Sequence, residues 1–269
     1  MEEMVKSPLS GKKLDAVVLI GLTGLSFLYA YLTANLYIGK PFFVFLFYTV
    51  TVVPYLSIRQ KKDWKKIILA TILFGVVFAF FLDFVAEFTQ TWTVVSRVFE
   101  QKILGVVPID NILAYMMMTL WTIVFYEHFV NDKKNKEVSP NFLFGLLLGL
   151  SAVAVTLVIY IIQPSFLLQL RYPYFYMGLA AITPTILLAI KKPNMIKKMA
   201  ITTSYFFVLY LILELFAVDY SYWIYTGDNY IGRITVFGRT FPFEEFFFWM
   251  MFYAASLVSY YEIFIDDLR

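Results

Sequence analysis

Hydrophobic residues follow one another along most of this chain in runs of roughly twenty, separated by short polar segments. A helix of about twenty apolar residues crosses the ~30 Å hydrocarbon core of a bilayer. The runs do not alternate between polar and apolar positions, as the strands of a membrane barrel do. We therefore predict an all-α integral membrane protein with about eight transmembrane helices, at residues 15–38, 42–58, 66–88, 104–130, 141–163, 173–190, 198–218 and 242–265.

Composition agrees with the pattern and removes several kinds of chemistry. Of 269 residues, 61% are hydrophobic and 15% are charged, with a mean hydropathy of +0.73, which is far more apolar than a soluble domain. The chain has no cysteine and a single histidine, His128, which excludes disulfides, thiolate metal sites and a cysteine nucleophile. It contains no G-x-G-x-x-G segment, no P-loop and no D-D-x-x-D motif. We therefore expect neither a metal nor a cofactor.

Basic residues predict how the chain crosses the membrane. The net charge is +3, and sixteen of the 22 lysines and arginines fall on one side of the predicted helices. Cytoplasmic loops carry this excess in membrane proteins. We therefore predict a multi-pass protein of the cell membrane with both termini in the cytoplasm. The basic loops set the topology, and nucleic acid is not an expected partner.

The two halves of the chain resemble each other. The segment F-L-D-F-V-A-E-F-T-Q-T-W, 81–92, aligns without gaps on I-L-E-L-F-A-V-D-Y-S-Y-W, 212–223. The sequence predicts two repeats, 1–135 with a core at 41–130, and 136–269 with a core at 172–265. Since each repeat has four helices, both insert in the same orientation. We expect a pseudo-twofold axis along the membrane normal and a cleft between the repeats.

Acidic residues recur at matching positions of the two halves. Pro108 and Pro242 are predicted to open the fourth and eighth helices, because proline suits a first helical position. Acids in the next turn face a helix dipole that favours negative charge. Glu127 and Glu262, at the far ends of these helices, are assigned to the cytoplasmic rim. The polar residues expected at one depth in the outer third of the membrane are Asp83, Asp110, Asn111, Glu214, Glu244 and Glu245.

These acids have two interpretations. They are either solvated helix caps at the membrane interface or groups that carry chemistry. Their recurrence in both halves and the phenylalanines that flank Glu244 and Glu245 favour chemistry, since ionisable residues within membrane spans are commonly functional. Apolar surroundings and a neighbouring carboxylate favour a state in which one group keeps its proton while another is ionised. The arrangement predicts proton donation and removal on an apolar substrate.

At P-F-E-E-F-F-F-W (242–249), repeated imperfectly as P-I-D-N-I-L-A-Y (108–115), the chain resembles the membrane-integral lycopene cyclases, which are duplicated-domain carotenoid cyclases. Each domain of that family has an acid late in one helix, a tryptophan-bearing loop, a glycine, a proline, an acidic pair and an aromatic helix ending in Tyr-Glu. The same order is present here as Asp83, Trp92, Gly105, Pro108, Asp110 and Tyr126-Glu127, and again as Glu214, Trp223, Gly238, Pro242, Glu244-Glu245 and Tyr261-Glu262. The likeness covers roughly residues 41–130 and 172–265.

The resemblance implies a lycopene β-cyclase, which converts an acyclic ψ-end into a β-ionone ring without net redox change. By position, it implies Glu244 or Glu245 as the acid and Glu214 as its partner or base. Asp110, Asp83 and Asn111 are expected to orient these groups or act as counter-charges. The aromatic residues that the resemblance suggests for substrate binding and cation stabilisation are Trp92, Trp223, Phe246 and Phe247.

The chain also departs from the family pattern. Asp110-Asn111 replaces the Glu-Glu pair in the first half, and Leu82 and Leu213 stand where tryptophan is common before the acid. We therefore expect the second repeat to carry the proton chemistry. The departures leave room for a different reaction at the end group.

Three alternatives remain open. One is hydration, or other cation chemistry, of a polyprenyl end. The others are a non-catalytic carotenoid binder and a proton-coupled transporter, although the acids lie near the outer edge of the membrane and not at its midplane, where carriers bind. Expected partners are lycopene or a related acyclic carotenoid, the lipid bilayer, and other membrane enzymes of carotenoid synthesis.

Overall fold

The computed structural model describes residues 11–35, 51–59, 64–95, 97–131 and 137–266, and most of these residues are helical. Residues 51–59 form a helix, while the rest of the predicted helix 42–58 lies outside the described ranges. The other helices are α1 (Lys12–Asn35), α3 (Trp64–Ile72), η1 (Leu73–Phe78), α4 (Ala79–Phe88), α5 (Ile109–Phe125), η2 (Tyr126–Val130), α6 (Phe142–Ile162), α7 (Pro164–Leu168), α8 (Pro173–Lys191), α9 (Asn194–Asp219), η3 (Glu245–Met251) and α10 (Tyr253–Phe264).

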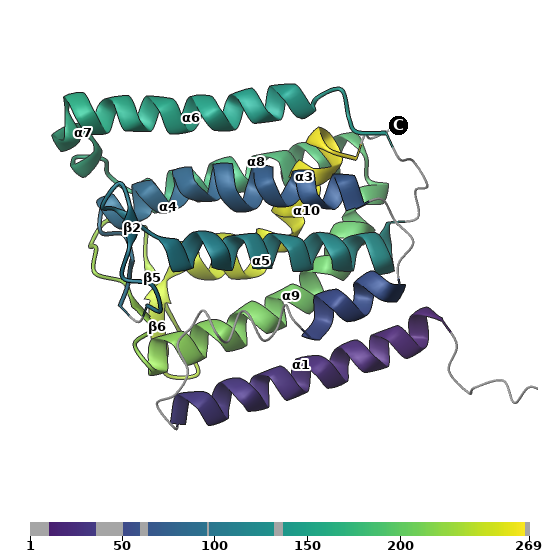
Figure 1. Ribbon diagram of the computed structural model, residues 1–269. Helices are drawn as coiled ribbons and strands as arrows, with labels where there is room; N and C mark the ends of the chain where they lie inside the picture. The colour runs from purple at the N-terminus through teal and green to yellow at the C-terminus, as the bar shows by residue number, and fades with distance from the viewer. Residues whose placement is uncertain (1–10, 36–50, 60–63, 96, 132–136, 267–269) are drawn as a thin grey trace, which may run out of the picture.

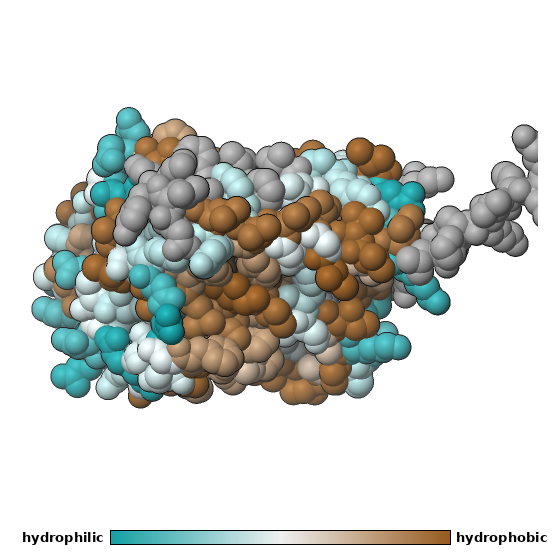
Figure 2. Space-filling view, turned by 90° about the horizontal axis from the view of Figure 1, so that it is seen from below, coloured by the Kyte–Doolittle hydropathy of each residue, from teal (hydrophilic) through white to brown (hydrophobic). Residues whose placement is uncertain are grey.

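Six helical segments among the described residues are long and apolar enough to cross a membrane. They are Lys12–Leu32, Trp64–Phe88, Ile109–Val130, Phe142–Ile162, Pro173–Lys191 and Asn194–Asp219. Hydrophobic residues cover the middle of the face seen in Figure 2, and hydrophilic residues gather at its two ends. The prediction of a helical membrane protein is confirmed at this level.

The long helices lie side by side, with α6 at one edge of the bundle and α1 at the other (Figure 1). Between them, α5 packs on α3, on η1 and on α10, and α10 packs on α8 and α9. Fully buried aromatic residues fill this centre, including Phe206, Tyr126 and Tyr261. The two segments that end in Tyr-Glu, α5–η2 and η3–α10, therefore meet in the middle of the bundle.

Short strands gather at one end of the bundle, which we call the hairpin end (Figure 1). Antiparallel pairs form between β2 (Lys102–Ile103) and β3 (Val107–Pro108), between β5 (Arg233–Val236) and β6 (Arg239–Pro242), and between β1 (Thr93–Val94) and β4 (Trp223–Ile224). The helix predicted to begin at residue 104 therefore begins at 109, after a hairpin. Gly105 and Gly238 turn these hairpins at φ +73° and +79°, values that favour glycine.

Both prolines of the acidic motifs end a strand and do not open a helix. Pro108 is the last residue of β3, and α5 begins after it at Ile109. Pro242 is the last residue of β6, and the following helix begins at Phe243. The acids therefore still lie in the first turns of their helices, now directly behind a hairpin.

Three segments are π-helical: η1, η2 and η3. A π turn contains an extra residue, which changes the direction of the side chains that follow, and such turns often occur at functional sites. The η3 segment begins at Glu245, and a break at Phe252 separates it from α10.

The ends of α4 and α9 are built alike. Gln90 and Ser221 take positive φ angles of 56° and 51°, and they are equivalent positions in the alignment of the two halves. The amide of Thr91 donates to the carbonyl of Ala86 at 2.9 Å, and that of Tyr222 to the carbonyl of Ala217 at 2.8 Å. This left-handed helix ending directs both chains into the strands β1 and β4, which then pair with each other.

Candidate active site

A cavity of about 110 Å³ lies at the hairpin end of the bundle, between the two halves of the chain. We call it the acid cavity. The first half lines it with Trp92, Val94, Asp110, Asn111, Ala114, Tyr115 and Met118. The second half lines it with Tyr174, Tyr210, Leu213, Glu214, Trp223, Glu245, Trp249, Met250 and Tyr253.

Two carboxyl groups from the second half, Glu214 and Glu245, face this cavity from different helices. Glu214 lies near the end of α9, and the indole N–H of Trp223 donates to both of its oxygens at 3.2 Å. The Tyr225 hydroxyl also donates to Glu214, at 2.7 Å. Glu245 opens η3 and accepts a hydrogen bond from the Tyr174 hydroxyl. The two carboxyls are near enough for their charges to interact.

Tyrosine hydroxyls supply much of the hydrogen bonding to these acids. Tyr225 lies in the loop between β4 and β5. Burial, followed by the charges of Glu214 and Glu245, raises the pKa of its hydroxyl well above the ordinary value. The hydroxyl therefore keeps its proton over the physiological range and remains a hydrogen-bond donor to Glu214.

Asp110 and Glu244 hold the loops in front of their helices. Asp110 accepts hydrogen bonds from the backbone amides of Val98, at 2.6 Å, and Phe99, at 3.3 Å. Glu244 accepts one from the amide of Ile231 at 2.7 Å. Glu244 is fully buried and does not line the acid cavity, whereas Asp110 borders it. The adjacent acids at 244 and 245 thus have separate roles in the structure: the first tethers the hairpin and the second faces the cavity.

In the first half, an amide occupies the position of the second acid. Asn111 donates from its side-chain nitrogen to both oxygens of Asp83, each at 3.0 Å. Both residues are buried, and Asn111 lines the cavity while Asp83 lies behind it. Asp83 is thus shielded from the cavity by its amide partner.

The predicted aromatic residues divide into two groups. Trp92 and Trp223 both line the acid cavity, with ring centroids 6.2 Å apart. Phe246 packs on Phe207 and Phe247 on Phe243, and neither phenylalanine lines the cavity. Consecutive helical residues point in directions about 100° apart, so residues next to Glu245 in sequence do not share its face.

Sequence reasoning missed several aromatic residues that do line the cavity. Trp249 and Tyr253 follow Glu245 at four-residue spacing, and Tyr115 follows Asn111 in the same way. Counting one turn from Asn111, and one and then two turns from Glu245, would have identified all three. Tyr174 and Tyr210 come from α8 and α9, and their positions gave no such signal.

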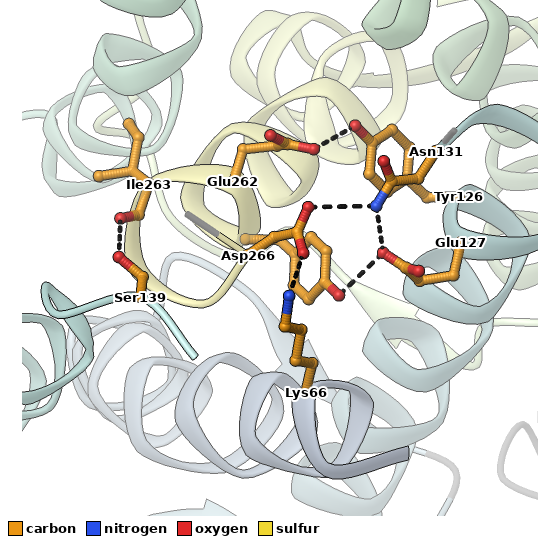
Figure 3. Close-up of polar contacts among 9 residues, drawn as sticks. Lys66, Tyr126, Glu127, Asn131, Ser139, Glu262, Ile263 and Asp266 are labelled. Atoms are coloured by element: carbon orange, nitrogen blue, oxygen red, sulfur yellow. Dashed lines mark hydrogen bonds and ion pairs between the residues drawn. The ribbon is translucent and has the colours of Figure 1, made fainter. Parts of the chain in front are cut away.

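A second buried polar group lies at the opposite end of the bundle from the hairpins; we call it the carboxylate–tyrosine cluster (Figure 3). Tyr126 donates to Glu262, and Tyr261 donates to Glu127 at 2.9 Å, so each half supplies the donor for the other. The other members bind as follows: Asn131 donates to Glu127 at 2.6 Å and to Asp266 at 3.1 Å, and Lys66 forms an ion pair with Asp266 at 2.6 Å.

Glu127 and Glu262, assigned from the sequence to the cytoplasmic rim, are therefore buried in this cluster, with 5% and 0% of their surfaces exposed. Neither lines the acid cavity. The distinction between two separate groups of acids is present in the structure as it was expected from the sequence.

No protein-family model, curated protein or solved structure matches this chain significantly. The geometry of the site and the sequence motifs are therefore the basis for a functional conclusion.

Proposed function

We propose that this protein is a membrane-integral lycopene β-cyclase that closes acyclic ψ-end groups to β-ionone rings by acid-initiated cation cyclisation. One observation carries the proposal: Glu214 and Glu245, from different helices, face one cavity whose other walls are mostly aromatic and aliphatic. Two nearby carboxylates in apolar surroundings repel each other, which favours a state with one proton between them. Such a pair offers an acid and a base without a cofactor.

In the proposed reaction, the protonated carboxyl of Glu245 donates its proton to the terminal carbon–carbon double bond of the substrate. The tertiary cation that results is attacked by the next reacting double bond, which forms the ring bond and moves the positive charge into the ring. Glu214 then removes a ring proton, and the electrons of that C–H bond form the ring double bond. Atoms and electrons balance, and the product has the mass of the substrate.

The aromatic walls suit a cationic intermediate. The π faces of Trp92, Trp223, Trp249 and Tyr253 border the cavity, and aromatic faces attract positive charge. Hydrogen bonds from Trp223 and Tyr225 hold Glu214 in one orientation. We assign Glu245 the role of acid from its place in the Pro-Phe-Glu-Glu motif. Glu214 is assigned the role of base, because the hydrogen bonds from Trp223 and Tyr225 favour its ionised form.

Reciprocal contacts support two repeats related by a pseudo-twofold axis. In a twofold arrangement, residue i of one unit contacts j of the other, and j contacts i. At the hairpin end, Thr93 pairs with Ile224, its equivalent in the alignment of the halves. At the opposite end, the two Tyr-Glu pairs exchange hydrogen bonds. Since these contacts lie at the two ends of the bundle, the axis that they suggest follows the membrane normal.

We further propose that the protein lies in the cell membrane with the hairpin end outside. The basic residues at the start of α3, Lys65 and Lys66, and those at 191–198 belong to the opposite end (Figure 1), and their charge favours a cytoplasmic position. Both termini, predicted to be cytoplasmic, lie outside the described residues.

Expression in cells that accumulate lycopene tests the function. Glu245→Gln is expected to lower cyclic product by about 10²–10⁴-fold, the usual contribution of a positioned general acid. Glu244→Gln is the matched control. The side-chain oxygen of the glutamine can still accept the hydrogen bond from the Ile231 amide, and residue 244 does not face the cavity. It should cyclise lycopene nearly as well as the parent.

Chromatography and mass spectrometry of the extracted pigment distinguish the alternatives. Cyclic product with the mass of lycopene supports the proposal, and a product heavier by one water favours hydration. Unchanged pigment bound to the purified parent protein favours a binder. Equal cyclic product from parent and Glu245→Gln cells overturns the catalytic assignment.

A further inference from the structure

A second cavity, of about 60 Å³, adjoins the acid cavity and differs from it in chemistry. The two share five lining residues: Trp92, Tyr115, Tyr174, Trp249 and Tyr253. The second cavity's other lining residues are Phe74, Ala79, Leu82, Ala86 and Met177. Among the residues that the structure describes, no carboxylate lines it, whereas Asp110, Glu214 and Glu245 line the acid cavity. We call it the apolar cavity.

The sequence leaves room here by placing small residues on one face of a helix. Ala79, Leu82 and Ala86 follow the i, i+3, i+7 spacing of a single face of α4. Both alanines are buried, so their small side chains and not solvent exposure create the space. Phe74 lines the same cavity from η1, the π-helical segment that precedes α4. One wall of the apolar cavity is therefore built from a single continuous helical stretch.

The shared wall positions the two cavities relative to each other. Trp249 stacks on Tyr174 with centroids 5.9 Å apart and an interplanar angle of 17°. The hydroxyl of Tyr174 is bound to Glu245, in the acid cavity. A molecule whose reacting end meets Glu245 thus has an apolar, aromatic-walled space directly behind that end.

We propose that the apolar cavity binds the unreactive polyene chain of the same acyclic isoprenoid whose end group enters the acid cavity. This inference rests on the proposed function and adds where the rest of the substrate lies. Two features select this occupant over a water-soluble one: the lack of carboxylates among the described lining residues, and the five lining residues that this cavity shares with the acid cavity. Burial of an apolar chain there contributes binding free energy in proportion to the area covered, which holds the end group at the acids.

Retention of substrate by a protein that does not turn it over tests the inference. Glu245→Gln protein is purified in detergent from lycopene-accumulating cells, and the pigment per folded protein is measured. Adding Ala79→Leu or Ala86→Leu fills the apolar cavity and should lower bound lycopene by about tenfold, because overpacked sites exclude further atoms. Leu82→Phe enlarges a half-buried side chain between the two alanines. It should fill the same cavity and destabilise the fold less than the two alanine variants.

Ala70→Leu is the control, since Ala70 is fully buried on α3 and lines neither cavity. It should retain pigment in proportion to the folded protein recovered. Full retention by the three filling variants overturns the inference, and so does a lack of bound lycopene in Glu245→Gln protein with both cavities intact. Cyclic product at the parent's level from Glu245→Gln cells would overturn the assignment of Glu245 as the acid, and a parent protein that forms no cyclic product would overturn the proposed function. Neither result changes the comparison of pigment retained by the filling variants and the control.

Discussion

The two ends of this bundle bury carboxyl groups in different ways. At the hairpin end, Glu214 and Glu245 face a cavity, and their partners are tyrosine and tryptophan donors. At the opposite end, Glu127, Glu262 and Asp266 are packed among tyrosines, an asparagine and a lysine (Figure 3). The second group links the two halves by hydrogen bonds, whereas the first lines a cavity between them. Among the described residues, no member of the second group lines either cavity.

This difference shows why a buried charge is weak evidence for a site when taken alone. A carboxylate enclosed by donors and a cation is a structural element, because its desolvation is offset within the protein. A carboxyl that faces an apolar cavity has donors on one side and a ligand-sized space on the other. We therefore expect substitutions at the hairpin end to change turnover, and substitutions at the opposite end to change stability.

The largest expected effect compares one acid from each end. Glu214→Gln should lower cyclisation by about 100-fold or more, because an amide cannot remove the ring proton. Thermal stability should change little, since the amide oxygen still accepts from Trp223 and Tyr225. Glu262→Gln should keep its bond from Tyr126 and most of the activity. Product yield and melting temperature in detergent measure both, and equal losses of activity would contradict the distinction.

The next effect concerns the ion pair in the carboxylate–tyrosine cluster. Lys66→Met removes the cation from the buried Asp266 and should destabilise the fold by about 3–5 kcal/mol. Activity per folded molecule should remain near that of the parent. Lys65→Met, at the exposed neighbouring position, is the matched control.

Combining Lys66→Met with Asp266→Asn sharpens this test, because the second change removes the uncompensated charge. The double variant should recover a large part of the lost stability, measured as the free energy of unfolding. If Lys66→Met lowers turnover and leaves the melting temperature unchanged, the cluster takes part in function and the contrast between the two ends fails.

The prediction of a helical membrane protein is confirmed, because long apolar helices follow from composition alone. The depth of the acids in a membrane stays a prediction. The sequence placed Glu214, Glu245, Trp92 and Trp223 in one group, and all four line the acid cavity. The hairpin at 102–108 was missed, because a short apolar strand cannot be distinguished from the start of a helix by hydrophobicity.

Side-chain direction was the weaker part of the prediction. Phe246 and Phe247 were chosen for their nearness to Glu245 in sequence, and they pack away from the cavity. The separate environments of Glu244 and Glu245 also depend on a tertiary contact, the amide of Ile231, that no local pattern encodes. Tyr174 likewise reaches Glu245 from a different helix.

The smallest expected effect tests the asymmetry of the two halves within the hairpin end. Asn111→Ala removes the donor that binds both oxygens of Asp83 and should lower turnover by about tenfold or less, since a typical hydrogen bond contributes about 0.5–1.5 kcal/mol net. Asn131→Ala, the counterpart in the carboxylate–tyrosine cluster, should lower the melting temperature and not the turnover of folded protein. If Asn111→Ala instead abolishes cyclisation as fully as Glu245→Gln, then Asp83 and Asn111 belong to the proton-transfer machinery. The first half would then share the chemistry that we assign to the second.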